Sequence, residues 1–151
     1  MENEMTPEQV KIVRLTFAQA MNRKVEVGMI FYERLFAIAP DTKVLFKGDI
    51  EEQSRKLMDT LAIAISNLRD TPALVGVLEA LAHRHVAYGV RAEHYDKVGE
   101  ALLWTLEKVF GAAFTGEVRN AWVTLYRIVA ETMLKATAGT TQAREGRSAS
   151  A

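Results

Sequence analysis

Two histidines lie one residue apart in the segment LEALAHRHVAYGV, which spans residues 78–90. Imidazole is the commonest side-chain metal ligand and can also transfer protons near neutral pH. Counted from Leu74, the apolar residues of this region and His85 fall at offsets 0, 3, 4, 7, 8 and 11, a continuous helical series. Because residues two apart on an α-helix point about 200° apart, His83 faces away from His85 and toward solvent. The two histidines therefore cannot bind one metal ion together.

Periodicity alone leaves two roles open for His85. A core histidine bonded to a carbonyl is the commoner outcome on an apolar helix face, whereas haem iron is commonly bound by a single helix-borne histidine. A zinc site is a weaker hypothesis, because the only other histidine is His94 and there is no cysteine to complete four ligands. Glu79 and His83 are four residues apart, but such a surface pair is usually solvated. No nucleophile of a catalytic triad is recognisable.

Helices must position these side chains. Residues that favour helix fill the long intervals between the three prolines, so the sequence predicts an all-α fold. Helix starts are indicated at Thr6 and Thr71, each followed by proline, and at Asp49, with a glutamate three residues later. Gly89 is expected to end the helix that carries His85. The predicted helices cover about residues 7–21, 24–38, 50–66, 72–88, 93–110 and 117–136.

The composition predicts one folded domain that binds neither nucleic acid nor a membrane. The chain has 151 residues, of which 49% are apolar and 25% charged, with 19 basic and 19 acidic residues. This length is enough to bury a single core, and the balanced charge does not favour nucleic-acid binding. No apolar run approaches the length of a membrane span, and the polar start lacks a secretory pattern, so a cytoplasmic location is expected. We expect a domain over residues 1–137 and a disordered tail over residues 138–151.

Five segments together carry a resemblance to a known family. They are FYERLFAIAPDTKVLF (31–46), QSRKLM (53–58), RHVAYGV (84–90), HYDKVGEALL (94–103) and AWVTLY (121–126). In this order and spacing the sequence resembles the globins, specifically the bacterial single-domain globins and the globin part of flavohaemoglobins. The stretch VLFKGDIEEQSRKLM (44–58) is similar to the thermophile- and methanotroph-type branch. The resemblance implies a globin fold, a three-over-three helical sandwich around haem b.

The same resemblance implies roles for individual residues near the haem iron. His85 would be the proximal iron ligand, and Tyr32 and Gln53 the polar pair on the distal side. Phe46 would pack as an aromatic wedge against the haem face, and Leu57 would crowd the sixth coordination position. Taken singly, each of these residues has an ordinary structural explanation, for example a core tyrosine bonded to a carbonyl. Their joint fit to the family pattern favours the haem site.

Further haem contacts follow from the resemblance. The residues concerned are Leu81, Arg84, Tyr88, Val90, Tyr95, Val98 and Leu102. Arg84, with Lys56 or Tyr88, is the candidate to bind the propionates. Gly28 and Ser54 match the position where two globin helices cross, and small residues there allow close approach.

The implied function is reversible, high-affinity binding of oxygen and other diatomic gases, including carbon monoxide and nitric oxide. The alternative is nitric oxide dioxygenase activity, in which Tyr32, Gln53 and Tyr95 would be catalytic and an external flavin reductase would supply electrons. The glutamate expected from the last helix would fall near Gly139, in the predicted tail, which argues against efficient dioxygenase or peroxidase activity. A haem-free helical interaction or sensor module is a third hypothesis. Either a monomer or a weak homodimer is compatible with the sequence.

Overall fold

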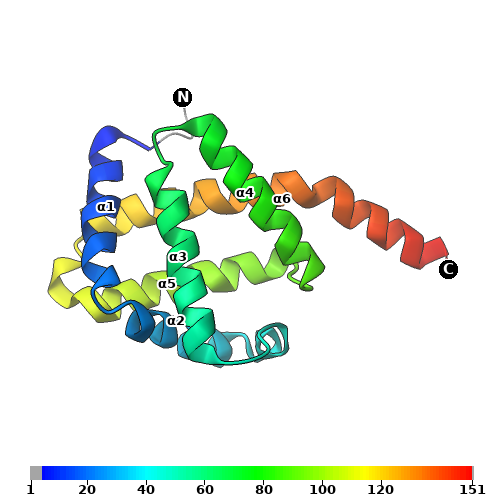
Figure 1. Ribbon diagram of the computed structural model, residues 1–151, viewed down its shortest axis with the longest axis horizontal. Helices are drawn as coiled ribbons and strands as arrows, with labels where there is room; N and C mark the ends of the chain where they lie inside the picture. Colours follow the sequence, from blue (N-terminus) through cyan, green and yellow to red (C-terminus); the bar gives the residue numbers. More distant parts are fainter. Residues whose placement is uncertain (1–4, 151) are drawn as a thin grey trace.

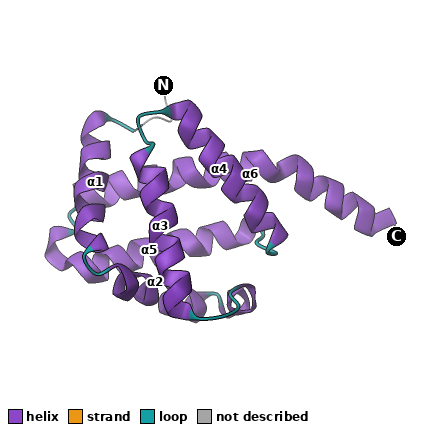
Figure 2. Cartoon of the chain, viewed as in Figure 1, coloured by secondary structure: helices purple, strands orange, loops and turns teal. Residues whose placement is uncertain are grey.

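The computed structural model describes the backbone of residues 5–150 and the side chains of residues 5–138. Every regular element over this range is helical (Figure 2). The α-helices are α1 (Pro7–Met21), α2 (Lys24–Ile38), α3 (Ile50–Ser66), α4 (Thr71–Ala87), α5 (Ala92–Phe110) and α6 (Gly116–Ser150). Two 3₁₀ segments, η1 (Pro40–Leu45) and η2 (Gly111–Ala113), connect α2 to α3 and α5 to α6.

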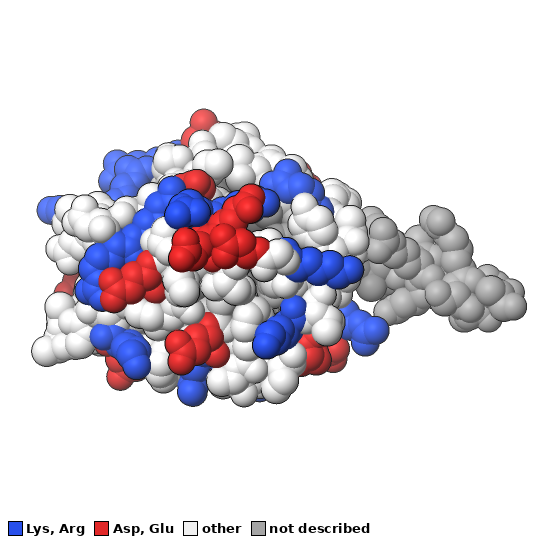
Figure 3. Space-filling model, turned by 60° about the horizontal axis from the view of Figure 1, so that its bottom comes forward, with Lys and Arg blue, Asp and Glu red and all other residues white. Residues whose placement is uncertain are grey.

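The helices form two crossed layers. Figure 1 shows α1, α3 and α4 running steeply across α5 and α6, with α2 at the foot of α3. α2 packs against both α3 and α5, whereas α4 packs mainly against α6 and α1 against α6. The predicted all-α, three-over-three globin fold is therefore confirmed. On the face shown in Figure 3, basic and acidic side chains are interspersed over the surface.

Side-chain caps begin the first and third α-helices, as predicted. The Thr6 hydroxyl accepts a hydrogen bond from the Gln9 backbone N–H at 3.1 Å, and the Gln9 side chain accepts one from the Thr6 N–H at 3.0 Å. The Asp49 carboxylate accepts from the Glu51 N–H at 3.1 Å. These bonds satisfy N–H groups of the first helical turn, which have no partner within the helix.

The start of α4 differs from the prediction by one residue. The sequence indicated Thr71 as the cap, but Asp70 holds that position and its carboxylate accepts a hydrogen bond from the Ala73 N–H at 3.1 Å. Thr71 and Pro72 are therefore the first two helical residues. Proline is tolerated there because N–H groups in the first turn need no helical acceptor.

The last helix is longer than predicted. The sequence indicated an end near Ala136 and a disordered tail from residue 138, whereas α6 extends to Ser150. Residues 140–150 include alanine, glutamine, arginine and glutamate, which are good helix formers. The side chains from residue 139 onward lie outside the described residues, so the domain boundary at 137 stays a prediction. None of the helices searched over the described residues is long and apolar enough to cross a membrane.

The tightest helix crossing joins α2 to α3 at Gly28 and Ser54. A Cβ atom added to Gly28 would lie 2.5 Å from the Ser54 Cβ and 2.8 Å from its Cα. Contacts this short cannot form without moving one of the helices, because neighbouring backbone atoms cannot rotate away. The structure thus confirms the close crossing that the sequence predicted.

Replacing Gly28 with alanine should destabilise the protein by about 1–3 kcal/mol, through the steric overlap with Ser54. Gly76 is a matched control, since it lies inside α4 and a Cβ added there meets nothing within 4 Å. Gly76→Ala should stabilise by about 0.5–1 kcal/mol, because alanine favours helix. Urea denaturation of both variants checks this. Similar stabilities for the two variants would contradict the close crossing.

Candidate functional site

His85 lies in the last turn of α4, which a glycine-dependent cap holds in place. Gly89 adopts φ 96°, the left-handed region that favours glycine. The Gly89 N–H donates to the Val86 carbonyl and the Val90 N–H to the His85 carbonyl, each at 3.0 Å. This pair of bonds is a Schellman motif. Gly89 therefore ends the helix as predicted, and the backbone of His85 is fixed by it.

The imidazole of His85 is half-buried and held neutral. Burial lowers its pKa most, the Leu81 carbonyl opposes that shift, and the neighbouring Arg84 charge lowers it further. Nδ1 is buried and has no partner of good hydrogen-bond geometry, so Leu81 acts on it only as a nearby dipole. Nε2 also makes no hydrogen bond to the described residues, but it is not sealed from solvent. By contrast, the His83 side chain is exposed, as helical phase predicted.

An apolar cavity of about 80 Å³ lies between α2, α3, α4, α5 and α6, and His85 is not among its lining residues. Four residues that the resemblance assigned to the haem line it, namely Leu57, Leu81, Val98 and Leu102. Leu81 is one helical turn before His85, so both lie on the same face of α4. The cavity is smaller than the roughly 300–1,000 Å³ of typical cofactor sites. Binding a cofactor there would require these side chains to move apart.

Sequence reasoning missed several residues that line this cavity. They are Phe31, Thr60, Leu61, Ala64, Ile65, Leu78, Leu125, Tyr126 and Val129. Most of them were recognisable only as core positions, because helical phase separates the core face from solvent and does not distinguish a cavity wall from ordinary packing.

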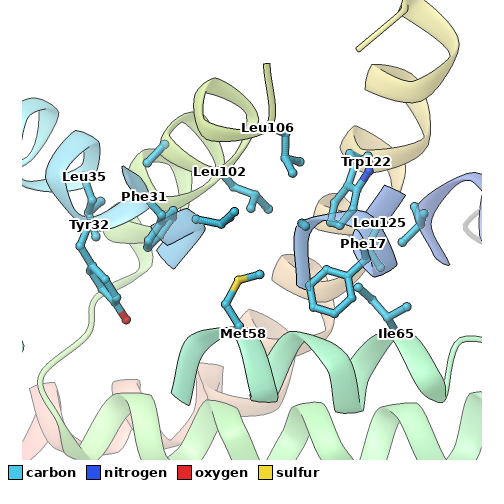
Figure 4. Close-up of a cluster of buried hydrophobic side chains, with 14 of the residues drawn as sticks. Phe17, Phe31, Tyr32, Leu35, Met58, Ile65, Leu102, Leu106, Trp122 and Leu125 are labelled. Carbon is cyan, nitrogen blue, oxygen red and sulfur yellow. The ribbon is translucent and has the colours of Figure 1, made fainter. Parts of the chain in front are cut away.

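Tyr32 lies on α2, one turn after Gly28, and is only 4% exposed. Its ring packs edge-on against Phe31 and Phe46, with ring centroids 5.1 and 5.0 Å away. In Figure 4 its hydroxyl points away from Leu35. No described residue forms a hydrogen bond with this hydroxyl, and burial raises the pKa of Tyr32 to about 12. Tyr32 is therefore a protonated donor without a hydrogen bond to a described residue, unlike a core tyrosine bonded to a carbonyl.

The other two residues expected near Tyr32 differ from each other. Phe46 is half-buried and contacts both Tyr32 and Phe36, so it lies beside Tyr32, while its packing against a haem face stays a prediction. Gln53 makes no hydrogen bond to Tyr32, because its amide Nε2 donates to the Lys47 carbonyl at 3.4 Å. Gln53 must leave this long contact before it could act beside Tyr32.

The residues predicted at the edge of the site are more exposed. Tyr88 is 65% exposed, and the Arg84 side chain is also exposed. Lys56 is exposed and lies 3.6 Å from the Glu52 carboxylate. Val90 is half-buried. The structure therefore leaves Arg84 and Tyr88 free to contact an acidic group at the surface.

Tyr95 is positioned by a residue that the sequence analysis did not select. The Tyr126 hydroxyl donates to the Tyr95 carbonyl at 2.5 Å. A Cβ added to Gly99 would lie 2.7 Å from the Tyr126 ring, so the glycine makes room for this tyrosine between α5 and α6. Burial raises the pKa of both tyrosines. Tyr126 lies four residues after Trp122, a spacing that indicates a shared helix face.

The third histidine has a structural role. His94 Nδ1 accepts a hydrogen bond from the Arg91 N–H at 2.9 Å, and its Nε2 lies 3.2 Å from the Asp41 carboxylate. His94 thereby joins the start of α5 to η1. Within the described residues, no three His, Cys, Asp or Glu side chains form a group that could hold a metal ion.

Known proteins are similar to this chain over most of its length. The family profile described as Globin matches residues 30–133. The neuroglobins of Dissostichus mawsoni and Chaenocephalus aceratus are each 31% identical over 137 residues, covering 82% of this chain and 86% of the relative. The flavohemoprotein of Vibrio cholerae is 28% identical over 133 residues, covering 86% of this chain and 34% of that protein.

These matches agree with the fold. The flavohemoprotein match covers only about a third of that protein, while the neuroglobins match over nearly their whole length. The narrower assignment to a thermophile- and methanotroph-type branch stays a prediction. The extent of the profile match and the identity to the neuroglobins show that this chain belongs to the globin family.

Proposed function

We propose that this chain holds haem b through His85 and binds oxygen reversibly and with high affinity, with Tyr32 as the distal hydrogen-bond donor. Membership of the globin family implies a haem-binding and oxygen-binding protein. The observation that supports the assignment of residues is that the Tyr32 hydroxyl and the His85 imidazole make no hydrogen bond to a described residue, while Phe31, beside Tyr32, and Leu81, one turn before His85, line one apolar cavity. The b type is supported by the absence of cysteine, since covalent c-type attachment requires thiols.

The fit to haem rests on the chemistry of the side chains present. When bound, haem would supply an iron atom that can bind a diatomic gas. His85 offers a neutral nitrogen, and its lowered pKa keeps the lone pair available at neutral pH. When His85 binds iron, the Leu81 carbonyl would accept a hydrogen bond from Nδ1 and so orient the imidazole ring. Leu81, Val98 and Leu102 would exclude water from the same side.

Tyr32 supplies the polar group of the pocket. Because burial holds its pKa at about 12, the hydroxyl keeps its proton at any physiological pH and can donate it in a hydrogen bond. Phe31 and Phe46 hold the ring, so little rotamer entropy is lost when it donates. A hydrogen bond to an acceptor that carries negative charge contributes about 1.5–3 kcal/mol. Such a donor supports slow release of oxygen.

A second candidate is nitric oxide dioxygenase activity with a separate flavin reductase. The similarity to a flavohemoprotein over 86% of this chain favours it, as does the anchoring of Tyr95 by Tyr126. In this reaction nitric oxide, oxygen and one electron would combine to give nitrate, and the reductase would supply the electron. Nitric oxide consumption with and without a flavin reductase and NADH separates the two candidates. Many turnovers per haem would support the enzyme, and a single turnover would support the gas-binding protein.

Replacing His85 with glycine should abolish the Soret absorption band of the purified protein after haem is supplied, because the iron loses its protein ligand. Free imidazole should restore the band in this variant by filling the space of the side chain. His83→Gly is the matched control, since His83 is exposed two residues earlier on the same helix, and it should keep the band. A wild-type protein without a Soret band would contradict the whole assignment.

Replacing Tyr32 with phenylalanine should speed oxygen dissociation by about ten- to a hundredfold, the effect of losing one hydrogen bond to a charged acceptor. Stopped-flow measurement with the ferrous protein gives this rate. Ser66→Ala removes a hydroxyl from the exposed end of α3 and should leave the rate unchanged. An unaltered rate in Tyr32→Phe would remove Tyr32 from the distal role.

A further inference from the structure

A second hollow is lined by other residues of α5 than those that line the apolar cavity. It is a surface groove of about 400 Å³ between α2, α5 and the start of α6, within the size range of small-molecule sites. Its lining includes Arg34, Lys97, Glu100, Trp104, Glu107 and Arg119. None of its lining residues lines the apolar cavity. The groove is therefore separate from the proposed haem site.

Arg34 is the unusual residue of this groove. Its guanidinium carbon lies 4.8 Å from the centre of the Trp104 ring, a cation–π distance that fixes the side chain in place. Its Nε atom is nevertheless buried and without any hydrogen-bond partner. Buried donors left unpaired are costly. An acceptor oxygen that entered the groove would satisfy this group, and a carboxylate could bind the guanidinium through two parallel hydrogen bonds.

The charges around the groove favour an anion with a single charge. Arg34, Lys97 and Arg119 are basic, but Glu100 and Glu107 also line the groove, and Glu100 lies 3.6 Å from the Lys97 ammonium. The carboxylates of Glu100 and Glu107 would repel a doubly charged phosphate ligand more strongly than they would repel a singly charged carboxylate ligand. Trp104 lies beneath the guanidinium, and the Lys108 ammonium lies 4.9 Å from the same ring. Ile38 and Leu103 also line the groove and offer apolar surface for the rest of a ligand.

We propose that this groove binds an organic monocarboxylate with an apolar body. The carboxylate binds Arg34, and the body packs on Ile38 and Leu103 beside Trp104, between α2 and α5. The proposal does not depend on haem, because no residue is shared between the two sites.

Octanoate is a suitable probe, with acetate and inorganic phosphate as comparisons. The protein is first saturated with haem and carbon monoxide, so that octanoate cannot bind at the proposed haem site. The chain has two tryptophans, and their indole N–H signals in a nitrogen-15 correlation spectrum report different places. Trp122 is buried and its Nε1 donates to the Thr16 hydroxyl at 2.9 Å, so it serves as an internal reference. The Trp104 signal should shift with saturation while the Trp122 signal stays in place.

Arg34→Gln should weaken octanoate binding by about ten- to a hundredfold, as expected for loss of a charged hydrogen-bonding partner. Arg34→Lys keeps the charge but loses the planar fork, and should also weaken binding. Arg69→Gln changes an exposed arginine outside the groove and should leave the affinity unaltered. Acetate should bind more weakly than octanoate, and phosphate should not shift Trp104. Equal affinity in wild type and Arg34→Gln, no saturable shift in wild type, or a stronger response to phosphate would each overturn the proposal.

Discussion

The close contact of Gly28 with Ser54 is the constraint on which the proposed distal side depends. Because Gly28 has no Cβ, α2 and α3 approach so closely that a Cβ atom at this position would overlap Ser54. Tyr32 follows Gly28 by one turn, and Leu57 follows Ser54 by three residues. The crossing therefore sets the distance between a buried hydroxyl on one helix and the cavity wall on the other. A larger residue would separate these elements before it altered any functional side chain.

Helical phase was sufficient to predict much of this arrangement, because burial on a helix repeats with the turn of the backbone. It placed His85 on the inner face and His83 outside, and it located the long helices closely. The cap of α4 was assigned one residue too late, since both Asp70 and Thr71 are good caps and the sequence alone does not say which side chain reaches Ala73. The backbone geometry decides which of two neighbouring cap residues is used, and the residue types alone do not reveal that geometry.

Contacts between segments distant in sequence were beyond such reasoning. The bond from Tyr126 to Tyr95 and the contact of His94 with Asp41 join residues that no periodicity relates. Gln53 shows the same limit, because a nearby loop carbonyl competes for its amide. The family resemblance supplied roles for Tyr95 and Gln53 only, whereas the structure shows which partners these side chains have. Arg34 and Trp104 were indicated by neither, since a cation above an aromatic ring depends on how α2 meets α5.

The contact between His94 and Asp41 spans 53 residues of chain, and α3 and α4 both lie within that span. The two helices thus belong to one long loop of the chain, and the contact of the His94 imidazole with Asp41 joins the two ends of this loop. Bringing the two ends of so long a loop together costs conformational entropy, and the contact between His94 and Asp41 offsets part of this cost. Within that span, α3 packs mainly against α2 and α4 mainly against α6, so each helix is also held from outside the loop.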